Sequence, residues 1–172
     1  VAASYLRREG YRSYSAQEVT RARGWADLDL GRDASLRLVA ALEDAPLAEH
    51  PGALTADELA ADRRQADTRF VEARAGKSVT QAQAAATLTA QTGAGDLSVT
   101  VYGLTRDLDN PLPFGYIALD RLAGGTRVAL EQDIGPTSLA LGVDAAVQRD
   151  DRFRSSNEAG QPVGDPTLDQ LE

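Results

Sequence analysis

The residues whose type and spacing best fit a catalytic role are two pairs of adjacent acids. Glu43-Asp44 and Asp150-Asp151 each place two carboxylates side by side, which is the residue type that general acid and base catalysis requires. Both pairs stand at the expected ends of strands, where charged side chains are normally solvated. We therefore favour solvated strand ends, nominate no catalytic residue and expect that the protein is not an enzyme.

The chain has no cysteine and one histidine, His50. This composition excludes disulfides, thiolate metal sites and cysteine nucleophiles. His50 lies next to Pro51 in an expected loop, and a solvated surface role is favoured there over metal ligation. We expect neither a metal nor a cofactor.

Arginines are the remaining candidates for ligand contact. Arg63, Arg64 and Arg69 fall in an expected long loop, where they could meet an anionic ligand. We favour the interpretation that these arginines neutralise the charge of nearby acidic residues. Four more stand near expected strand ends: Arg7, Arg8, Arg106 and Arg149. We expect Arg106 to line the interior if the strands form a barrel, and assign no substrate-binding residue.

The composition excludes two classes of protein. A net charge of −8 and a pI near 4.7 argue against a nucleic-acid partner, because phosphate binding needs a clustered basic surface. No apolar run approaches the roughly 20 residues of a membrane-spanning helix. The mean hydropathy of −0.33 is compatible with membrane strands, because these need only about 10 residues of alternating character.

Alternation of apolar and polar residues is the strongest structural signal, because successive side chains of a strand point to opposite faces. Thr80–Ala90 is rich in alanine and glutamine and is compatible with a helix on propensity, but strand spacing sorts its glutamines and threonines onto one face. We count seven strands, at 1–8, 21–30, 35–43, 80–90, 97–102, 126–131 and 138–150.

The connections between these strands alternate between short and long. Tight turns are expected at 31–34, 92–96 and 133–137, where glycine, aspartate and proline supply turn chemistry. Longer segments are expected at 9–16, 46–76 and 107–124, with a tail from Asp151. In an antiparallel meander, this rhythm places all long loops at one end, as in outer-membrane barrels.

One short helix is expected inside the long segment 46–76. Thr55 and Glu58 have the spacing of a capping box, so the helix should start after Thr55 and end near Arg64. The fold class expected overall is therefore all-β, an antiparallel meander of about seven amphipathic strands.

Three stretches resemble the barrel region of TonB-dependent outer-membrane receptors of the siderophore type. Gly10-Tyr11-Arg12 before a long strand resembles an early barrel hairpin. Pro51–Thr55, with the following helix and Arg64–Asp67, resembles an external loop. Tyr102–Phe114 is similar to a strand and its loop. The resemblance covers nearly the whole chain, so residues 1–172 are interpreted as part of such a barrel, without plug or TonB box.

The resemblance implies a barrel of roughly 22 strands in the outer membrane, closed by a plug and energised through the TonB system. It implies active uptake of a scarce solute, with a ferric siderophore as the expected ligand and lipid as the surrounding partner. The low aromatic content of 5% and the placement of Trp25 on the polar face depart from the aromatic girdles of such barrels.

Two other functions are compatible with the same pattern. One is a soluble β-barrel or sandwich that binds a ligand through its loops. The other is a hydrolytic enzyme on a membrane barrel, which the lack of a serine-histidine arrangement argues against. Because unpaired strand edges and an apolar face invite association, we expect the isolated chain to close on itself or form a homo-oligomer.

Overall fold

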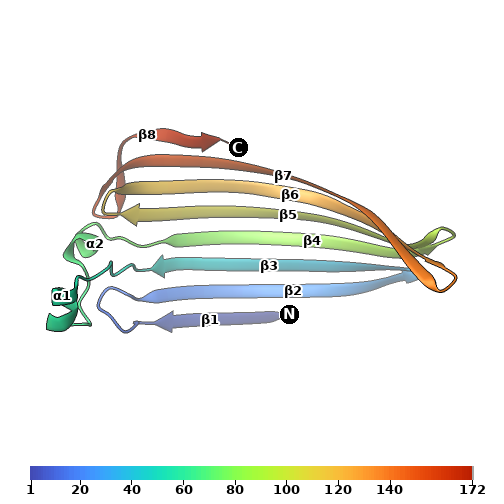
Figure 1. Ribbon diagram of the computed structural model, residues 1–172, viewed down its shortest axis with the longest axis horizontal. Coiled ribbons are helices and arrows are strands. Elements are labelled where there is room, and N and C mark those ends of the chain that lie inside the picture. Colours follow the sequence, from blue (N-terminus) through green and yellow to red (C-terminus); the bar gives the residue numbers. More distant parts are fainter. Residues whose placement is uncertain (172) are drawn as a thin grey trace.

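The computed structural model of the chain describes residues 1–171 as one antiparallel sheet (Figure 1). Its eight strands lie in the order in which they occur along the chain, and neighbours pair antiparallel. The sheet is therefore a simple meander. The strands are β1 (Ala2–Arg8), β2 (Gln17–Gly31), β3 (Ala34–Ala48), β4 (Ser78–Thr92), β5 (Gly95–Leu112), β6 (Gly115–Ile134), β7 (Thr137–Glu158) and β8 (Gln161–Leu171).

The all-β class, the meander and all seven expected strands are confirmed. Thr80–Ala90 lies inside β4, so side-chain alternation outweighs the helix propensity of alanine. Three tight turns are also confirmed, at 32–33, 93–94 and 135–136. These turns lie together at one end of the sheet, which we call the turn end (Figure 1).

The loop expected at Asp107–Gly124 is wrong, because β5 and β6 run through it and join at Pro113 and Phe114. Pro111 does not interrupt the pairing. Its carbonyl accepts from the Gly76 N–H at 3.0 Å, on the side away from β6, and the nitrogen of the same residue points to that side. The missing N–H of Pro111 therefore removes no hydrogen bond to β6.

The tail expected from Asp151 is also wrong. β7 continues to Glu158, and after a turn at 159–160 the chain returns as β8, an eighth strand that alternation does not reveal. β8 contains Pro162 and Pro166 and lies at the edge of the sheet, where proline is tolerated. Short and long connections consequently do not alternate strictly.

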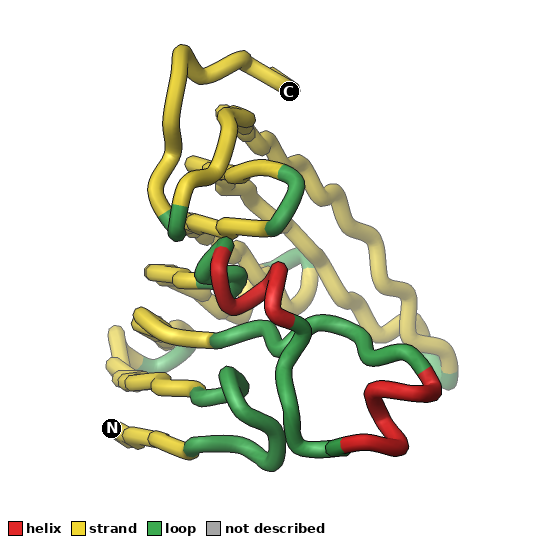
Figure 2. The backbone as a smooth tube through the Cα atoms, turned by 90° about the vertical axis from the view of Figure 1, so that its left-hand side faces the viewer, coloured by secondary structure: helices red, strands yellow, loops and turns green. Residues whose placement is uncertain are grey.

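The two long connections, 9–16 and 49–77, lie at the opposite end from the three tight turns, and we call it the loop end (Figure 2). The expected helix is confirmed as α1 (Ala56–Ala61), with the capping box of Thr55 and Glu58 in place. A second helix, α2 (Thr68–Glu72), starts at the N-cap Asp67 and was not predicted, because five residues are too few for a helical period.

The sheet is open: β1 pairs only with β2, and β8 only with β7. Of the two expected alternatives, closure of the chain on itself is not found in residues 1–171, and the homo-oligomer stays a prediction. Among residues 1–168, whose side chains the structure describes, only Ala45 and Ala75 are buried apolar residues, so these residues form no core of large side chains. Within the same residues, no helix is both long and apolar enough to cross a membrane.

Candidate functional site

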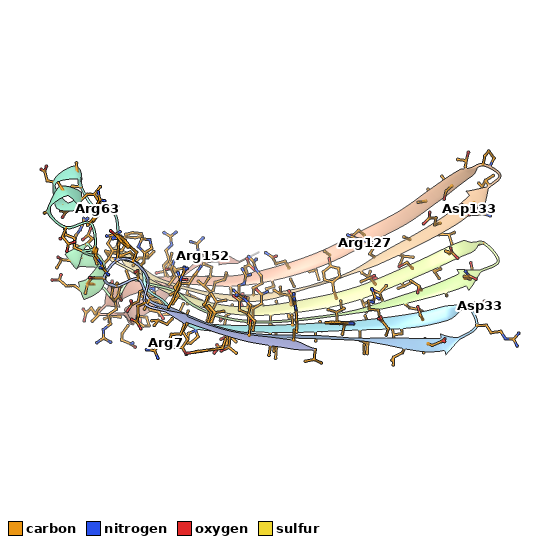
Figure 3. The ribbon with its side chains drawn as sticks, turned by 90° about the horizontal axis from the view of Figure 1, so that it is seen from below. Arg7, Asp33, Arg63, Arg127, Asp133 and Arg152 are labelled. Atoms are coloured by element: carbon orange, nitrogen blue, oxygen red, sulfur yellow. The ribbon has the colours of Figure 1, made fainter. Side chains whose placement is uncertain are left out.

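The strand register sorts the side chains onto two faces of different chemistry. Residues that pair directly across neighbouring strands lie on one face, and Arg21, Glu43, Gln81, Arg106, Arg121 and Asp150 form one such row. We call this side the polar face and the other the apolar face. Figure 3 shows Arg127 and Arg152 on the polar side of the ribbon and Arg7 on the opposite side.

Ion pairs across the β6–β7 ladder occupy the polar face. Arg121 binds Asp150 with both nitrogens of its fork, with Nε 2.7 Å from Oδ1. Arg127 donates from two nitrogens to a single oxygen of Asp144, with Nε 2.8 Å from Oδ2. The side chains of Arg121 and Asp150 are 27% and 11% exposed, and those of Arg127 and Asp144 are 69% and 43% exposed. The first pair is therefore the better shielded from water.

The same kind of cross-strand bond continues over β2 to β5. Arg21 donates to Glu43 at 2.6 Å and Arg37 to Asp27 at 2.6 Å, and Arg106 Nε donates to Gln81 Oε1 at 2.7 Å. Hydroxyl pairs Thr87 with Thr100 and Ser35 with Thr89 lie between them. Each bond joins neighbours in the register, so the network holds the strands in one alignment.

An aromatic residue covers a glycine in the middle of the polar face. Gly125 pairs with Tyr102, and a methyl group at Gly125 would lie 2.5 Å from the Tyr102 hydroxyl and 2.6 Å from the Ala145 carbonyl oxygen. The ring of Tyr102 therefore occupies space that only glycine leaves open. Trp25 lies on the same face, as the alternation of β2 predicts, and is 58% exposed.

The apolar face carries leucine and valine side chains that no described part of the chain covers. On β7 these are Leu139, Leu141, Val143 and Val147, with Ala145 between them. Val143 and Val147 are 72% and 73% exposed. The β7 row continues across the sheet into Leu28, Leu36, Leu38, Leu42, Leu88, Val99, Val101, Leu122 and Val128. A contiguous apolar surface of this kind marks contact with lipid or another apolar partner.

In each of the two acid pairs, the two carboxylates do not lie side by side in the structure. Asp150 and Asp151 are adjacent in a strand, so they point to opposite faces. Asp150 is held by Arg121 and Gln148, and Asp151 accepts from Arg149 at 3.1 Å. Glu43 and Asp44 are separated in the same way, with Asp44 accepting from Thr80. Neither pair has the shared site that catalysis by two carboxylates needs.

His50 is an exposed loop residue, as expected. Its Nδ1 accepts from the Gly52 N–H at 3.0 Å, and its ring stacks on Phe70 at a centroid distance of 4.9 Å. These contacts give His50 a structural role in the long loop. No group of three or more histidine, aspartate or glutamate residues within 1–168 is arranged to hold a metal ion.

The loop arginines act mainly on the loop itself. Arg69 pairs with Asp67 at 2.7 Å, and this guanidinium holds the pKa of the Asp67 carboxyl below its usual range. Arg64 lies over the ring of Tyr11, with its guanidinium carbon 5.5 Å from the centroid, a cation–π contact. Arg63 is exposed on the loop (Figure 3). Balancing local acids is thus confirmed for Arg69.

The four arginines near strand ends are spread over both faces. Arg7 lies 4.0 Å from Glu9, and Arg8 donates to Gln17. Arg149 binds Asp151 on the apolar side, whereas Arg106 lies on the polar face. The structure therefore brings only Arg106 next to another cation, Arg121, which the sequence interpretation did not single out. Alternation gave no signal for Arg121, because Ile117 and Leu119 share its face and Asp120 lies on the other face.

Arg12 ties the two long connections together at the loop end. Its guanidinium donates to the carbonyl oxygens of Gln65, Gly52 and Pro51 at 2.9, 2.6 and 3.0 Å. Ser13 adds a backbone bond to the Arg64 carbonyl at 2.7 Å. Asn157 of β7 donates to the Ala73 and Leu112 carbonyls at 2.8 and 3.0 Å. The long loop is thus anchored to its neighbours along the loop end.

Taken together, the geometry gives a sheet with one polar face, whose loop end carries an anchored loop. Comparisons with known proteins add no family to this description. No protein-family model matches the chain, and no curated protein matches it.

Proposed function

We propose that the chain is part of the transmembrane barrel of a TonB-dependent outer-membrane receptor, which takes up a scarce solute, a ferric siderophore, by active transport. Outer-membrane lipid is then the partner of the apolar face. The family's plug and the TonB system are the partners that couple transport to energy. The proposal rests on the resemblance of the sequence and on the physical character of the sheet.

The observation that carries the proposal is the exposed apolar face of a sheet that has no core. On β7 the apolar residues run from Leu139 to Val147, nine residues that end at Arg149. At about 3.3 Å per residue, this band is roughly 27 Å long, and a strand tilt near 40° reduces its height to about 20 Å. Membrane strands have apolar segments of this length, about 9–11 residues.

The opposite face supports the same proposal. A lumen-facing surface is polar and contacts water, plug or solute, and the polar face here carries charged and hydroxyl side chains joined across the strands. A soluble sandwich would instead bury one face of the sheet against a second layer. The part of the chain that the structure describes supplies no such second layer.

The two ends of the sheet also differ as the two sides of an outer-membrane barrel do. Every connection at the turn end is a two-residue turn, whereas the loop end carries the long segments 9–16 and 49–77 beside two short turns at 113–114 and 159–160. In outer-membrane barrels, short turns face the periplasm and long loops face outward. The proposal therefore places the α1–α2 loop at the cell exterior.

Uptake of labelled iron tests the function. Cells that lack the gene for this chain are compared with cells that carry it, supplied with radioactive ferric siderophores, with and without an uncoupler of the proton gradient. The expected result is accumulation that needs both the gene and the gradient. Two matched variants are compared for the amount of protein in the outer membrane. Val143→Arg, on the apolar face, should be absent from that membrane, whereas Ala140→Arg, on the polar face, should still be present in it.

Accumulation that does not depend on the gene would contradict transport. Recovery of the protein in the aqueous fraction without detergent, as a stable species, would favour the soluble β-structured binding module instead. Detergent dependence together with iron uptake is the combination that supports the receptor.

A further inference from the structure

A pocket opens on the apolar face at the loop end, where β8 leaves the regular register of β7. The pairing of β7 with β8 shifts between Arg152 and Phe153 and again between Arg154 and Ser156. Gly164 lies in the second interruption with a φ of 81°, a backbone conformation that favours glycine. The irregular edge strand leaves a cavity of about 360 Å³ beside β7.

Aromatic and proline side chains form the walls of this pocket. Phe153 of β7 and Tyr116 of β6 lie diagonally across the β6–β7 ladder, and Pro162 and Pro166 line the pocket from β8. Aromatic side chains at diagonal positions are within reach of each other, yet these two rings do not stack among the ring pairs of the described residues. The rings therefore border the cavity and leave it open.

The charge of the lining is negative. Among the described residues, the lining contains one carboxylate, Asp109, and neither arginine nor lysine. The Tyr116 hydroxyl interacts with this carboxylate, and Asp109 takes part in no ion pair of the described chain. One row nearer to the apolar band, Asp107 pairs directly with Asp120 on the same face. Carboxylates gathered on one side of a surface raise the local concentration of cations.

This combination of groups favours an organic ammonium ion over other ligands. An ammonium group is attracted to the faces of aromatic rings and to a carboxylate. A metal ion such as Ca²⁺ needs about six to eight oxygen ligands, more than Asp109 and the hydroxyls of Tyr116 and Ser155 supply. An anion would be repelled by Asp109.

The height of the pocket indicates the source of the ammonium group. The apolar run of β7 ends at Arg149, and Phe153 follows four residues later on the same face. At about 3.3 Å per residue this is roughly 13 Å along the strand, and a tilt near 40° reduces it to about 10 Å of height. The headgroup layer of a bilayer extends about 5–8 Å beyond the hydrocarbon. The pocket is therefore level with the outer edge of that layer, where the amine of an aminolipid headgroup lies.

We propose that this pocket binds the ammonium group of a membrane lipid headgroup. Phe153 and Tyr116 supply the ring faces, and Asp109 supplies the opposite charge. The choice of a lipid rests on the proposed function, because it requires the apolar face to contact the membrane. A lipid held there would stay with the protein beside β7 and β8.

A pair of soluble probes of equal shape tests the ammonium site. The full chain is purified in a non-ionic detergent, and equilibrium dialysis compares radioactive choline with its uncharged carbon analogue, 3,3-dimethylbutan-1-ol. We expect choline to bind more tightly by about fivefold or more, the size of a cation–π contact near water. Phe153→Leu and Asp109→Asn should each weaken choline binding by about fivefold. Asp109→Asn should leave binding of the uncharged analogue unchanged.

Two control variants test position. Asp107→Asn removes a carboxylate from the same strand and face, outside the lining of the pocket. Tyr5→Leu removes an aromatic ring from the same face at β1. Both should leave choline binding nearly unchanged. The comparison of choline with its analogue uses the unaltered protein, so it does not depend on the folding of any variant.

Lipid retention distinguishes a headgroup from a free solute. The protein is equilibrated with equal amounts of phosphatidylethanolamine and phosphatidylglycerol in detergent, and mass spectrometry counts the lipids that remain bound after washing. We expect phosphatidylethanolamine to be retained in preference, and Phe153→Leu to remove this preference while the retained phosphatidylglycerol changes little.

Each outcome decides one of the proposals. Equal binding of choline and its analogue, or choline binding that Phe153→Leu does not weaken, would overturn the ammonium site even if iron uptake is observed. Choline binding without preferential retention of phosphatidylethanolamine would overturn the lipid headgroup as the occupant. Preferential retention by a protein that supports no iron uptake would overturn the transport function and leave this site standing.

Discussion

The two faces of this sheet are held in different ways. The polar face is stabilised by bonds within the chain, because ion pairs such as Arg121 with Asp150 and Arg37 with Asp27 join strand to strand. The leucine and valine band of the apolar face has no ion pair of this kind among the described residues, and Val143 and Val147 in it are largely exposed. The polar face therefore fixes the register of the strands, whereas the apolar face still requires a partner to cover it.

A charge placed on the apolar face should have the largest effect. Val143 lies at the centre of the band from Leu139 to Val147, so Val143→Arg should lower the free energy of unfolding in lipid vesicles by about 2–4 kcal/mol, the cost of arginine near the bilayer midplane. Ala140→Arg, on the polar face of the same strand, should cost much less. Urea titration in vesicles measures both, and equal costs would remove the distinction between the faces.

Filling the space beneath Tyr102 should have the next largest effect. Gly125→Ala forces a methyl group against the Tyr102 ring and the Ala145 carbonyl, which should cost about 1–3 kcal/mol through overpacking. Gly103→Ala is the matched control on the apolar face, because the nearest atom there is 3.8 Å away. If Gly103→Ala destabilised the protein as much as Gly125→Ala, the contact of Tyr102 with Gly125 would have no special role.

The two ion pairs on β6 and β7 should differ in strength. Arg121→Gln leaves Asp150 shielded and without its charged partner, and should cost about 1–2 kcal/mol of unfolding free energy. Arg127→Gln affects a more exposed pair and should cost less than about 1 kcal/mol. Double-mutant cycles with Asp150→Asn and Asp144→Asn measure the two coupling energies, and a larger value for the exposed pair would contradict this ranking.

Acid should loosen the α1–α2 loop. Hydrogen bonding to Arg69 lowers the pKa of Asp67, and the backbone N–H of Thr55 lowers the pKa of Glu58. The stability they contribute is therefore present above the unfolded-state pKa values near 4 and is lost as the pH falls through the folded-state values. Amide exchange in 55–72 should accelerate over this acidic range, and Asp67→Asn should reduce the change.

Alternation predicted the strands well where one face is apolar throughout. In β7 and β4 the period of two is unbroken, so strand and face followed from the sequence, including the polar phase of Trp25. Beyond the apolar band the signal ends, because both faces of the strand ends contact water. The extensions of β5 and β6, and all of β8, were therefore missed or assigned to loops.

The candidate surface could be predicted only in part. Arg106 was placed on the polar face from its phase, but the pairing of Arg106 with Arg121 depends on a register between strands that alternation does not specify. The role of Gly125 depends on the same register. Arg12 could not be identified either, because its three carbonyl partners lie 39 to 53 residues away in the long loop.

The most direct test of the account uses the absence of cysteine from the chain. Single cysteines at each position from 139 to 148, in the protein within its native membrane, are labelled with a water-soluble, membrane-impermeant maleimide and with a lipid-soluble one. We predict strict alternation along the strand. Cysteines at odd positions, which lie on the apolar face, should react only with the lipid-soluble reagent. Cysteines at even positions should react with the water-soluble reagent once that reagent has access to the polar face. Uniform reaction of odd and even positions with the water-soluble reagent would contradict a lipid-facing sheet.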